Sequence, residues 1–136
     1  MSPLQGVAKI SLTCCTSITD ITALGKSTSL LSLSLSNCTG ITNISSLGES
    51  NTITYLNLNG CTGITDVSAL ARCKTLTKLD MTDCLVEDVN VLEGCQSLVE
   101  LNISRCSRVV DISSLGGGNI KYLYTVYCRG LQHRQT

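Results

Sequence analysis

The chain contains no Phe or Trp and only four Tyr among its 136 residues, so aromatic side chains cannot form the centre of a hydrophobic core. Hydrophobic residues still make up 43% of the sequence, and any core must be built from Leu, Ile, Val and Cys. The ten basic and ten acidic residues cancel, which argues against the basic surface of a nucleic-acid or anionic-membrane binder. No apolar stretch is long enough to span a bilayer. This composition suits a stack of thin aliphatic layers.

A secretory signal is also missing, because the first residues, MSPLQGVAKI, lack a basic start followed by an apolar run. The nine cysteines form an odd set, which does not suit a secreted protein whose cysteines are all paired in disulfides. We therefore expect a reducing intracellular compartment, cytoplasmic or nuclear.

A segment of 22 or 23 residues recurs along the chain, most clearly as ITYLNLNGCTGITDVSALARCKT over residues 53–75. The copies give about five full repeats and a partial sixth over residues 7–131. We expect residues 1–6 to be the remnant of a preceding repeat and residues 132–136 to be a frayed tail. A period of this length is typical of a solenoid. One cysteine marks the same place in every copy: Cys15, Cys38, Cys61, Cys84, Cys106 and Cys128.

The first part of each repeat reads L-x-x-L-x-L-x-x-C, with apolar residues alternating as at Leu56 and Leu58. This period of two predicts a half-buried strand. Because the chain returns to the same side in every repeat, the strands should be parallel and about 4.8 Å apart. Equivalent residues then form continuous rows, and the marker cysteines form a buried row where each strand ends.

The second part of each repeat reads I-T-D-V-S-A-L, and its Asp or Asn can accept hydrogen bonds from backbone N–H groups two or three residues further on. We expect this residue to cap a short 3₁₀ or one-turn helix, because too few residues remain for a longer helix. The position is occupied by Asp20, Asn43, Asp66, Asp88 and Asp111.

The combined pattern LxxLxLxxCxxITDVSxL resembles the leucine-rich repeats over essentially the whole chain. Its length and its I-T-D-I/V-S-x-L half are similar to the short repeats of internalin-type proteins. The cysteine resembles that of ubiquitin-ligase substrate adaptors, and C-T-G-I-T-D-V-S-x-L is similar to trypanosome expression-site-associated leucine-rich-repeat proteins. Those trypanosome proteins carry a separate RING domain, which this sequence does not supply. The resemblance implies an α/β solenoid, a leucine-rich repeat horseshoe with a parallel concave β-sheet and short 3₁₀ or one-turn helices on its convex side. It also implies a protein that binds other proteins, usually on the concave sheet.

The sequence offers little for catalysis, metals or cofactors. Structural zinc sites use closely spaced cysteine pairs such as C-x₂-C, and none is present. Cys14 and Cys15 are adjacent, and on a strand their side chains would point to opposite faces. A redox pair of Cys73 with Cys95 on the convex side is an alternative to inert packing. The one histidine, His133, lies in the expected tail, so we predict no enzyme activity, no metal and no cofactor.

The outward-facing strand positions are the place where specificity can reside. The first two repeats carry short hydroxyl side chains there, whereas aromatic and charged side chains typical of binding hot spots follow from the third repeat onward. The two alternatives are a solvated face that binds nothing and, for the last tyrosines, a cover over the open edge of the last coil. The predicted protein-binding residues are Tyr55, Asn57, Lys78, Asp80, Asp83, Glu100, Asn102, Arg105, Tyr122 and Tyr124.

Three functions remain open at this point. The first is a non-catalytic scaffold that binds a protein partner on the concave sheet, without nucleic acid or membrane. The second is a structural repeat segment that forms homo-oligomers through uncapped solenoid ends. The third is a surface adhesin of internalin type, which the missing signal and the unpaired cysteines disfavour.

Overall fold

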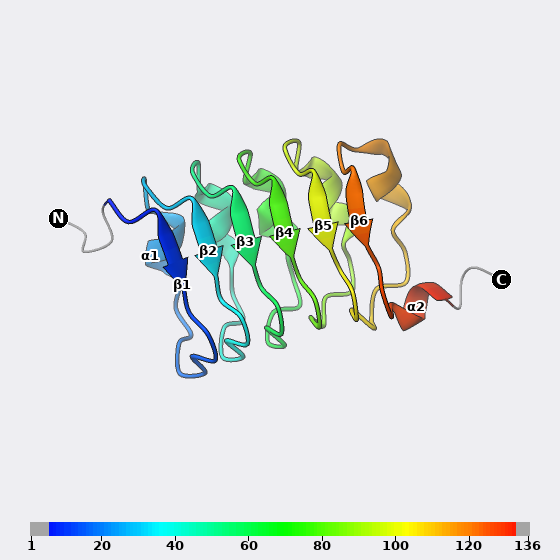
Figure 1. Cartoon of the computed structure of the whole chain (residues 1–136), viewed down its shortest axis with the longest axis horizontal. Helices are drawn as coiled ribbons and strands as arrows, with labels where there is room; N and C mark the ends of the chain where they lie inside the picture. Colours follow the sequence, from blue (N-terminus) through cyan, green and yellow to red (C-terminus); the bar gives the residue numbers. More distant parts are fainter. Residues whose placement is uncertain (1–5, 133–136) are drawn as a thin grey trace.

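The computed structural model describes residues 6–132, and side chains over residues 6–131. One parallel sheet holds six strands in sequence order, curved and open at both edges (Figure 1). The strands are β1 (Lys9–Ser11), β2 (Ser32–Ser34), β3 (Tyr55–Asn57), β4 (Lys78–Asp80), β5 (Glu100–Asn102) and β6 (Tyr122–Tyr124).

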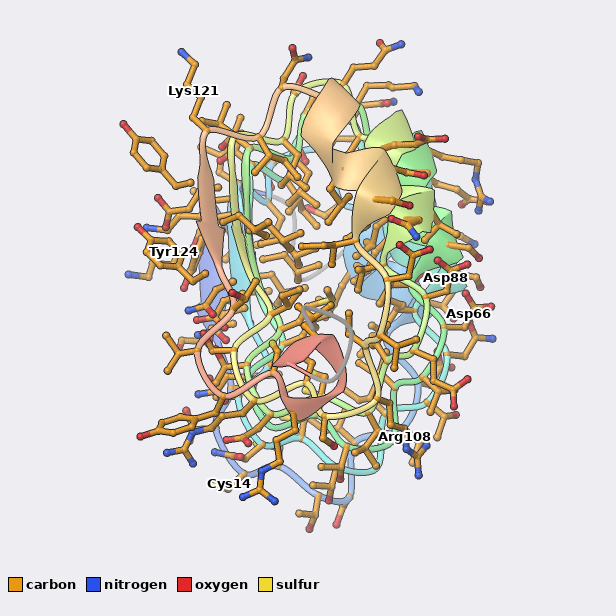
Figure 2. All side chains as sticks on the ribbon, turned by 90° about the vertical axis from the view of Figure 1, so that its right-hand side faces the viewer. Cys14, Asp66, Asp88, Arg108, Lys121 and Tyr124 are labelled. Atoms are coloured by element: carbon orange, nitrogen blue, oxygen red, sulfur yellow. The ribbon has the colours of Figure 1, made fainter. Side chains whose placement is uncertain are left out.

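Short helices form the side opposite the sheet (Figure 1). Figure 2 shows the two sides along the stack, with Tyr124 on the sheet side and Asp66 and Asp88 on the helical side. The predicted α/β solenoid is therefore confirmed. Among residues 6–132, no helix has the length and hydrophobicity needed to cross a membrane. The helices are α1 (Thr22–Gly25), η1 (Ser45–Glu49), η2 (Ser68–Arg72), η3 (Asn90–Gly94), η4 (Ser113–Gly117) and, after β6, α2 (Arg129–Gln132).

The strands pair in the register that the repeat predicts. Leu56 of β3 pairs with Leu33 of β2 and with Leu79 of β4, and the same row continues to Leu101 and Leu123. The two coils that are one residue shorter keep this register, because their missing residues fall outside the strands. Inward leucines from coils two to five are almost completely buried, and they make one continuous core.

Each convex helix is preceded by the predicted Asp or Asn. Oδ1 of Asp66 accepts a hydrogen bond from the Ser68 backbone N–H at 2.9 Å, and Oδ1 of Asn43 accepts one from Ser45 at 2.8 Å. The donor is the first residue of the helix, two positions after the acceptor, so the interaction is an Asx turn that leads into the helix. The hydrogen bond from Ser68 lowers the pKa of Asp66, because it favours the charged carboxylate.

In the turn that follows each strand, a single residue adopts the left-handed conformation. Its φ is between 57° and 63° for the five non-glycine residues and 73° for Gly60. The chain turns there, so that the following cysteine points into the core. The backbone N–H of the left-handed residue still donates a hydrogen bond to the next coil, as where Asn37 donates to the carbonyl of Asn59 at 2.7 Å. We name this the left-handed position; its residues are Cys14, Asn37, Gly60, Asp83, Arg105 and Tyr127.

Cys14 and Cys15 do not lie on a strand. The prediction that strand alternation turns their side chains to opposite faces is therefore wrong. Strand β1 ends at Ser11, and Cys14 has φ 57° in the turn. The side chain of Cys14 is exposed, whereas Cys15 is half-buried below the first coil.

The buried cysteines donate hydrogen bonds as well as filling space. The thiol of Cys61 lies 2.9 Å from the carbonyl oxygen of Leu35, and the thiol of Cys84 lies 3.1 Å from that of Leu58. Each acceptor belongs to the preceding coil and would otherwise keep a lone pair without a donor. All nine cysteines are free, so the solenoid holds together without disulfides.

We expect Gly60→Ala to reduce the free energy of unfolding by about 1–2 kcal/mol, because an L side chain is disfavoured in the left-handed conformation. The added Cβ would also run into Oδ1 of Asn37 on the preceding coil. Urea unfolding followed by circular dichroism measures the change. The control is Gly116→Ala, where the new Cβ has nothing within 4 Å. Equal losses in the two variants would contradict this account of the turn.

Candidate functional site

The outward face of strands β3 to β5 carries a row of three interacting side chains. Nζ of Lys78 lies 3.2 Å from Oε2 of Glu100 and 5.7 Å from the centroid of the Tyr55 ring. Strand pairing places the three residues at one level, because Tyr55 pairs with Lys78 and Lys78 pairs with Glu100. The Lys78 side chain is 52% exposed, so the ion pair contributes little to stability. Its effect is to hold the ammonium group between a ring and a carboxylate.

The next outward row serves mainly to end the strands. Oδ1 of Asn57 accepts from the backbone N–H of the residue two positions on at 2.8 Å, and Oδ1 of Asp80 and Asn102 do so at 2.9 Å. These Asx turns occupy one oxygen of each predicted binding residue. Only the second polar atom of each side chain is left for a ligand, so this row offers less to a partner than the sequence predicts.

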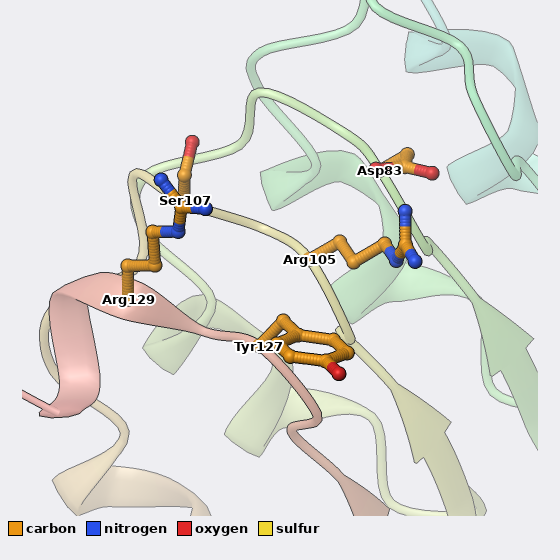
Figure 3. A pocket seen from close by; sticks show the side chains of 5 residues that line it. All are labelled: Asp83, Arg105, Ser107, Tyr127 and Arg129. Atoms are coloured by element: carbon orange, nitrogen blue, oxygen red, sulfur yellow. The ribbon is translucent and has the colours of Figure 1, made fainter.

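A third group lies at the turn edge of the last three coils (Figure 3). The guanidinium carbon of Arg105 lies 5.6 Å from the ring centroid of Tyr127, a distance at which a cation and an aromatic face attract. Ser107 and Arg129 complete a hollow of about 350 Å³, whose five lining residues also include Asp83.

The hydroxyl-rich half of the sheet forms a second hollow of about 520 Å³. Small side chains, among them Ser32 and Ser34, give it a low floor, while Tyr55 and Lys78 stand at one side and Lys9 at the other. Ser32 and Ser34 were not among the predicted binding residues, although a run of small residues beside large ones could have indicated the hollow.

The tyrosines of the last strand are exposed on the open edge. Tyr122 is 54% exposed and Tyr124 44% exposed, and the inward-facing Leu123 is 37% exposed where its counterparts in β2 to β5 are at most 1% exposed. No strand pairs with the outer edge of β6 within residues 6–132. These tyrosines thus continue the outward rows of the sheet and also border an edge that lacks a following coil.

Eight of the ten predicted residues therefore fall into three groups and not into one site, and Tyr122 and Tyr124 continue two of these groups at the open edge. Ser107, Tyr127 and Arg129 were missing from the prediction. Tyr127 shares the left-handed position with Asp83 and Arg105, and Ser107 and Arg129 share the position two residues later, so the repeat alignment contained the signal. His133 lies outside the described residues.

Burial disfavours the thiolate form of four buried cysteines. Burial raises the pKa of Cys84 to about 12, and it raises the pKa of Cys61, Cys95 and Cys106 to about 11. A redox pair needs a thiolate, so the raised pKa of Cys95 disfavours the pairing with Cys73. Within the described residues, no group of three or more His, Cys, Asp or Glu side chains could hold a metal ion.

Comparisons with known proteins agree with this geometry. The sequence matches the family described as "Leucine Rich repeat" over residues 49–71 and 72–89. The structure is similar to that of an internalin (inlF) from Listeria monocytogenes, with a TM-score of 0.68 and 31% identity over 78% of this chain and 31% of that chain. An internalin C2 (inlC2) from the same organism has a TM-score of 0.55 and 20% identity over 89% of this chain and 62% of that one, which shows the fold alone. A comparison with curated proteins found no match.

The repeated coil, the parallel sheet and the buried cysteine row define a leucine-rich-repeat protein. Its repeats resemble those of the internalins, as the sequence predicts. This chain spans less than two thirds of the length of either internalin, 31% of one and 62% of the other. The similarity to trypanosome leucine-rich-repeat proteins stays a prediction.

Because of the buried thiols, the free energy of unfolding should fall at alkaline pH. A thiol in the unfolded chain ionises near its ordinary pKa of about 8.5, while Cys84 in the folded chain ionises near about 12. Because the folded pKa is the higher one, stability is complete below about pH 8.5 and falls as the pH rises toward 12.

Between pH 7.5 and pH 10.5, wild type should lose stability, and Cys84→Ala should lose less. The difference between the two losses should be about 2–3 kcal/mol, because pH 10.5 lies about two units above the unfolded pKa. Urea unfolding at the two pH values measures both losses. The exposed Cys14→Ala is the control and should lose as much as wild type. If Cys84→Ala behaves like wild type, the thiol is not buried in neutral form.

Proposed function

We propose that this protein is a non-catalytic interaction module that binds a protein partner on the outward face of its sheet. The observation that supports this best is the fixed row of Tyr55, Lys78 and Glu100 on three paired strands. Aromatic and charged side chains of this kind are enriched where interfaces gain most of their affinity. Here they are held on a rigid scaffold, so a partner would order few side chains on binding.

The hollow beside this row gives the face a shape that a partner can fill. Its floor of small hydroxyl side chains lies between Lys9 and the Tyr55–Lys78 pair, and it offers hydrogen-bonding groups around a recess of about 520 Å³. A protruding side chain of the partner would enter this recess and contact the Tyr55 ring. Recognition would depend on shape and on local charge, because the chain has no net charge for long-range attraction.

The comparisons support a protein-interaction repeat module in general. Leucine-rich repeats and internalin-type solenoids are the structures to which this chain is similar, and neither comparison identifies a ligand. The choice of the sheet face rests on the side chains of this chain alone.

The proposal is tested by the double variant Tyr55→Ala/Lys78→Ala. Immobilised wild type should retain a partner from a cell lysate, and the double variant should bind the purified partner at least thirtyfold more weakly, or about 2 kcal/mol, the scale of a hot spot. Isothermal titration calorimetry with the purified partner measures the loss.

The matched control for this experiment is Lys26→Ala. It also removes one positive charge, but Lys26 is exposed at the end of α1, on the helical side of the solenoid. The control should bind like wild type, and circular dichroism should show that all variants are folded. A partner that binds the double variant and wild type equally would place the interface elsewhere.

Self-association through the last coil is a second candidate. The last coil exposes Leu123 of β6 at 37% and, beyond the end of β6, Val126 at 58% and Tyr127 at 63%. These apolar side chains lie beside a strand edge that has no partner strand in the described chain. Open edges of this kind favour pairing with another chain.

For this candidate we expect sedimentation velocity to show a weight-average mass that rises with concentration between about 5 and 500 μM, the range in which weak associations of about 1 mM to 1 μM become visible. Leu123→Glu should abolish the rise, and the surface control Glu87→Gln should leave it unchanged. A wild type that stays monomeric over the whole range would contradict self-association.

A further inference from the structure

The hollow at the turn edge is built by two positions of the repeat. Asp83, Arg105 and Tyr127 occupy the left-handed position in coils four, five and six, and Ser107 and Arg129 follow two residues later in coils five and six. The turns of successive coils lie beside each other, so these five side chains surround one space of about 350 Å³ (Figure 3).

The polar groups around this space are mostly hydrogen-bond donors. Two guanidinium groups line it, and neither forms an ion pair within the described residues. The hydroxyl groups of Ser107 and Tyr127 add two further donors, and Asp83 supplies the one acidic side chain. A neutral chain thus concentrates two positive charges, one negative charge and two hydroxyl groups around one recess, which leaves an excess of one positive charge there.

The same positions in the preceding coils are different. Asn37 and Gly60 stand at the left-handed position, and Thr39 and Thr62 stand two residues later, without any charge. In the last coils, Arg105 and Tyr127 are held in a conformation that disfavours large side chains. The ring of Tyr127 lies 5.6 Å from the Arg105 guanidinium carbon and limits where that group can go.

We propose that this hollow binds an oxyanion, a phosphate monoester or a carboxylate, with Arg105 and Arg129 as the charged donors. Guanidinium groups match the planar and tetrahedral oxygens of such anions, and charge-assisted hydrogen bonds are about twice as strong as neutral ones. Ser107 and Tyr127 donate the additional hydrogen bonds. The carboxylate of Asp83 lowers the affinity for an anion. When no anion is bound, it offsets part of the positive charge of Arg105.

The carrier of the anion is a side chain of the protein partner, and this part rests on the proposed function. The hollow lies beyond the ends of β4, β5 and β6, and β4 and β5 also carry Lys78 and Glu100, so one bound chain can cross the sheet and place an acidic or phosphorylated residue here. The anion site itself does not depend on that partner and is measured with small anions.

The test is a titration of ¹⁵N-labelled protein with inorganic phosphate and, separately, with acetate, each against sodium chloride of equal ionic strength. Saturable shifts of the amide signals of Arg105, Ser107, Tyr127 and Arg129 support the proposal. Tighter binding of phosphate identifies a phosphate monoester as the ligand, and tighter binding of acetate identifies a carboxylate. Shifts that grow linearly with both anions, like those with chloride, overturn the proposal.

Variants taken from the repeat itself keep the fold. Arg105→Asn introduces the residue of coil two, and Arg129→Thr introduces the residue of coils two and three. Each should weaken anion binding about tenfold, the scale of one charge-assisted hydrogen bond. Asp83→Asn, again a residue of coil two, should tighten binding severalfold. Arg72→Gln on the helical side is the control and should change nothing. A loss with Arg72→Gln equal to that with Arg129→Thr would overturn the assignment.

The outcome separates this site from the proposed function. Tyr55→Ala/Lys78→Ala should bind inorganic phosphate or acetate as wild type does, because neither residue lines the hollow. If the double variant still binds the protein partner fully, the sheet-face proposal fails while the anion site stands. If the wild type shows no saturable anion binding, the anion site fails while the sheet face stands.

Discussion

The solenoid depends on one backbone conformation that recurs in every coil. Where each strand ends, a single residue with positive φ turns the chain inward, and the cysteine that follows enters the core. There the thiol donates to a carbonyl of the preceding coil, at 3.0 Å from Cys106 to Met81 and from Cys128 to Ile103. The turn therefore fixes both the direction of the chain and the hydrogen bond that joins one coil to the next.

The same turn places two large side chains, Arg105 and Tyr127, at this edge in an unusual conformation. Glycine, asparagine and aspartate accept positive φ with little strain, and they occupy three of the six positions. Arg105 and Tyr127 are large residues in a conformation that such residues rarely adopt. Strained positions persist where the surrounding structure holds them, and they are often part of a binding site. The packed coils on either side provide that support here.

Most of the fold could be predicted from the sequence, because each coil repeats one pattern. The period of two at Leu56 and Leu58 indicated the strand, and the 22- or 23-residue spacing indicated parallel register. The site was less predictable. A strand pattern shows that Asn57 and Asp80 face outward, but it cannot show that one oxygen of each already accepts a backbone hydrogen bond. The turn-edge hollow was not predicted for a related reason. Its lining residues lie two positions apart, and the direction of their side chains depends on the left-handed turn.

Within residues 6–132, strands lie beside strands and helices beside helices of neighbouring coils only. A coil copied in tandem would therefore meet the surfaces that its parent already meets, and the sheet would grow by about 4.8 Å without disturbing any other coil. The coils that are one residue shorter show that the segments outside the strands tolerate changes in length while strand register is kept. Gene duplication could thus extend the span of the surface in fixed steps, and point mutation could then give each new coil its own outward side chains.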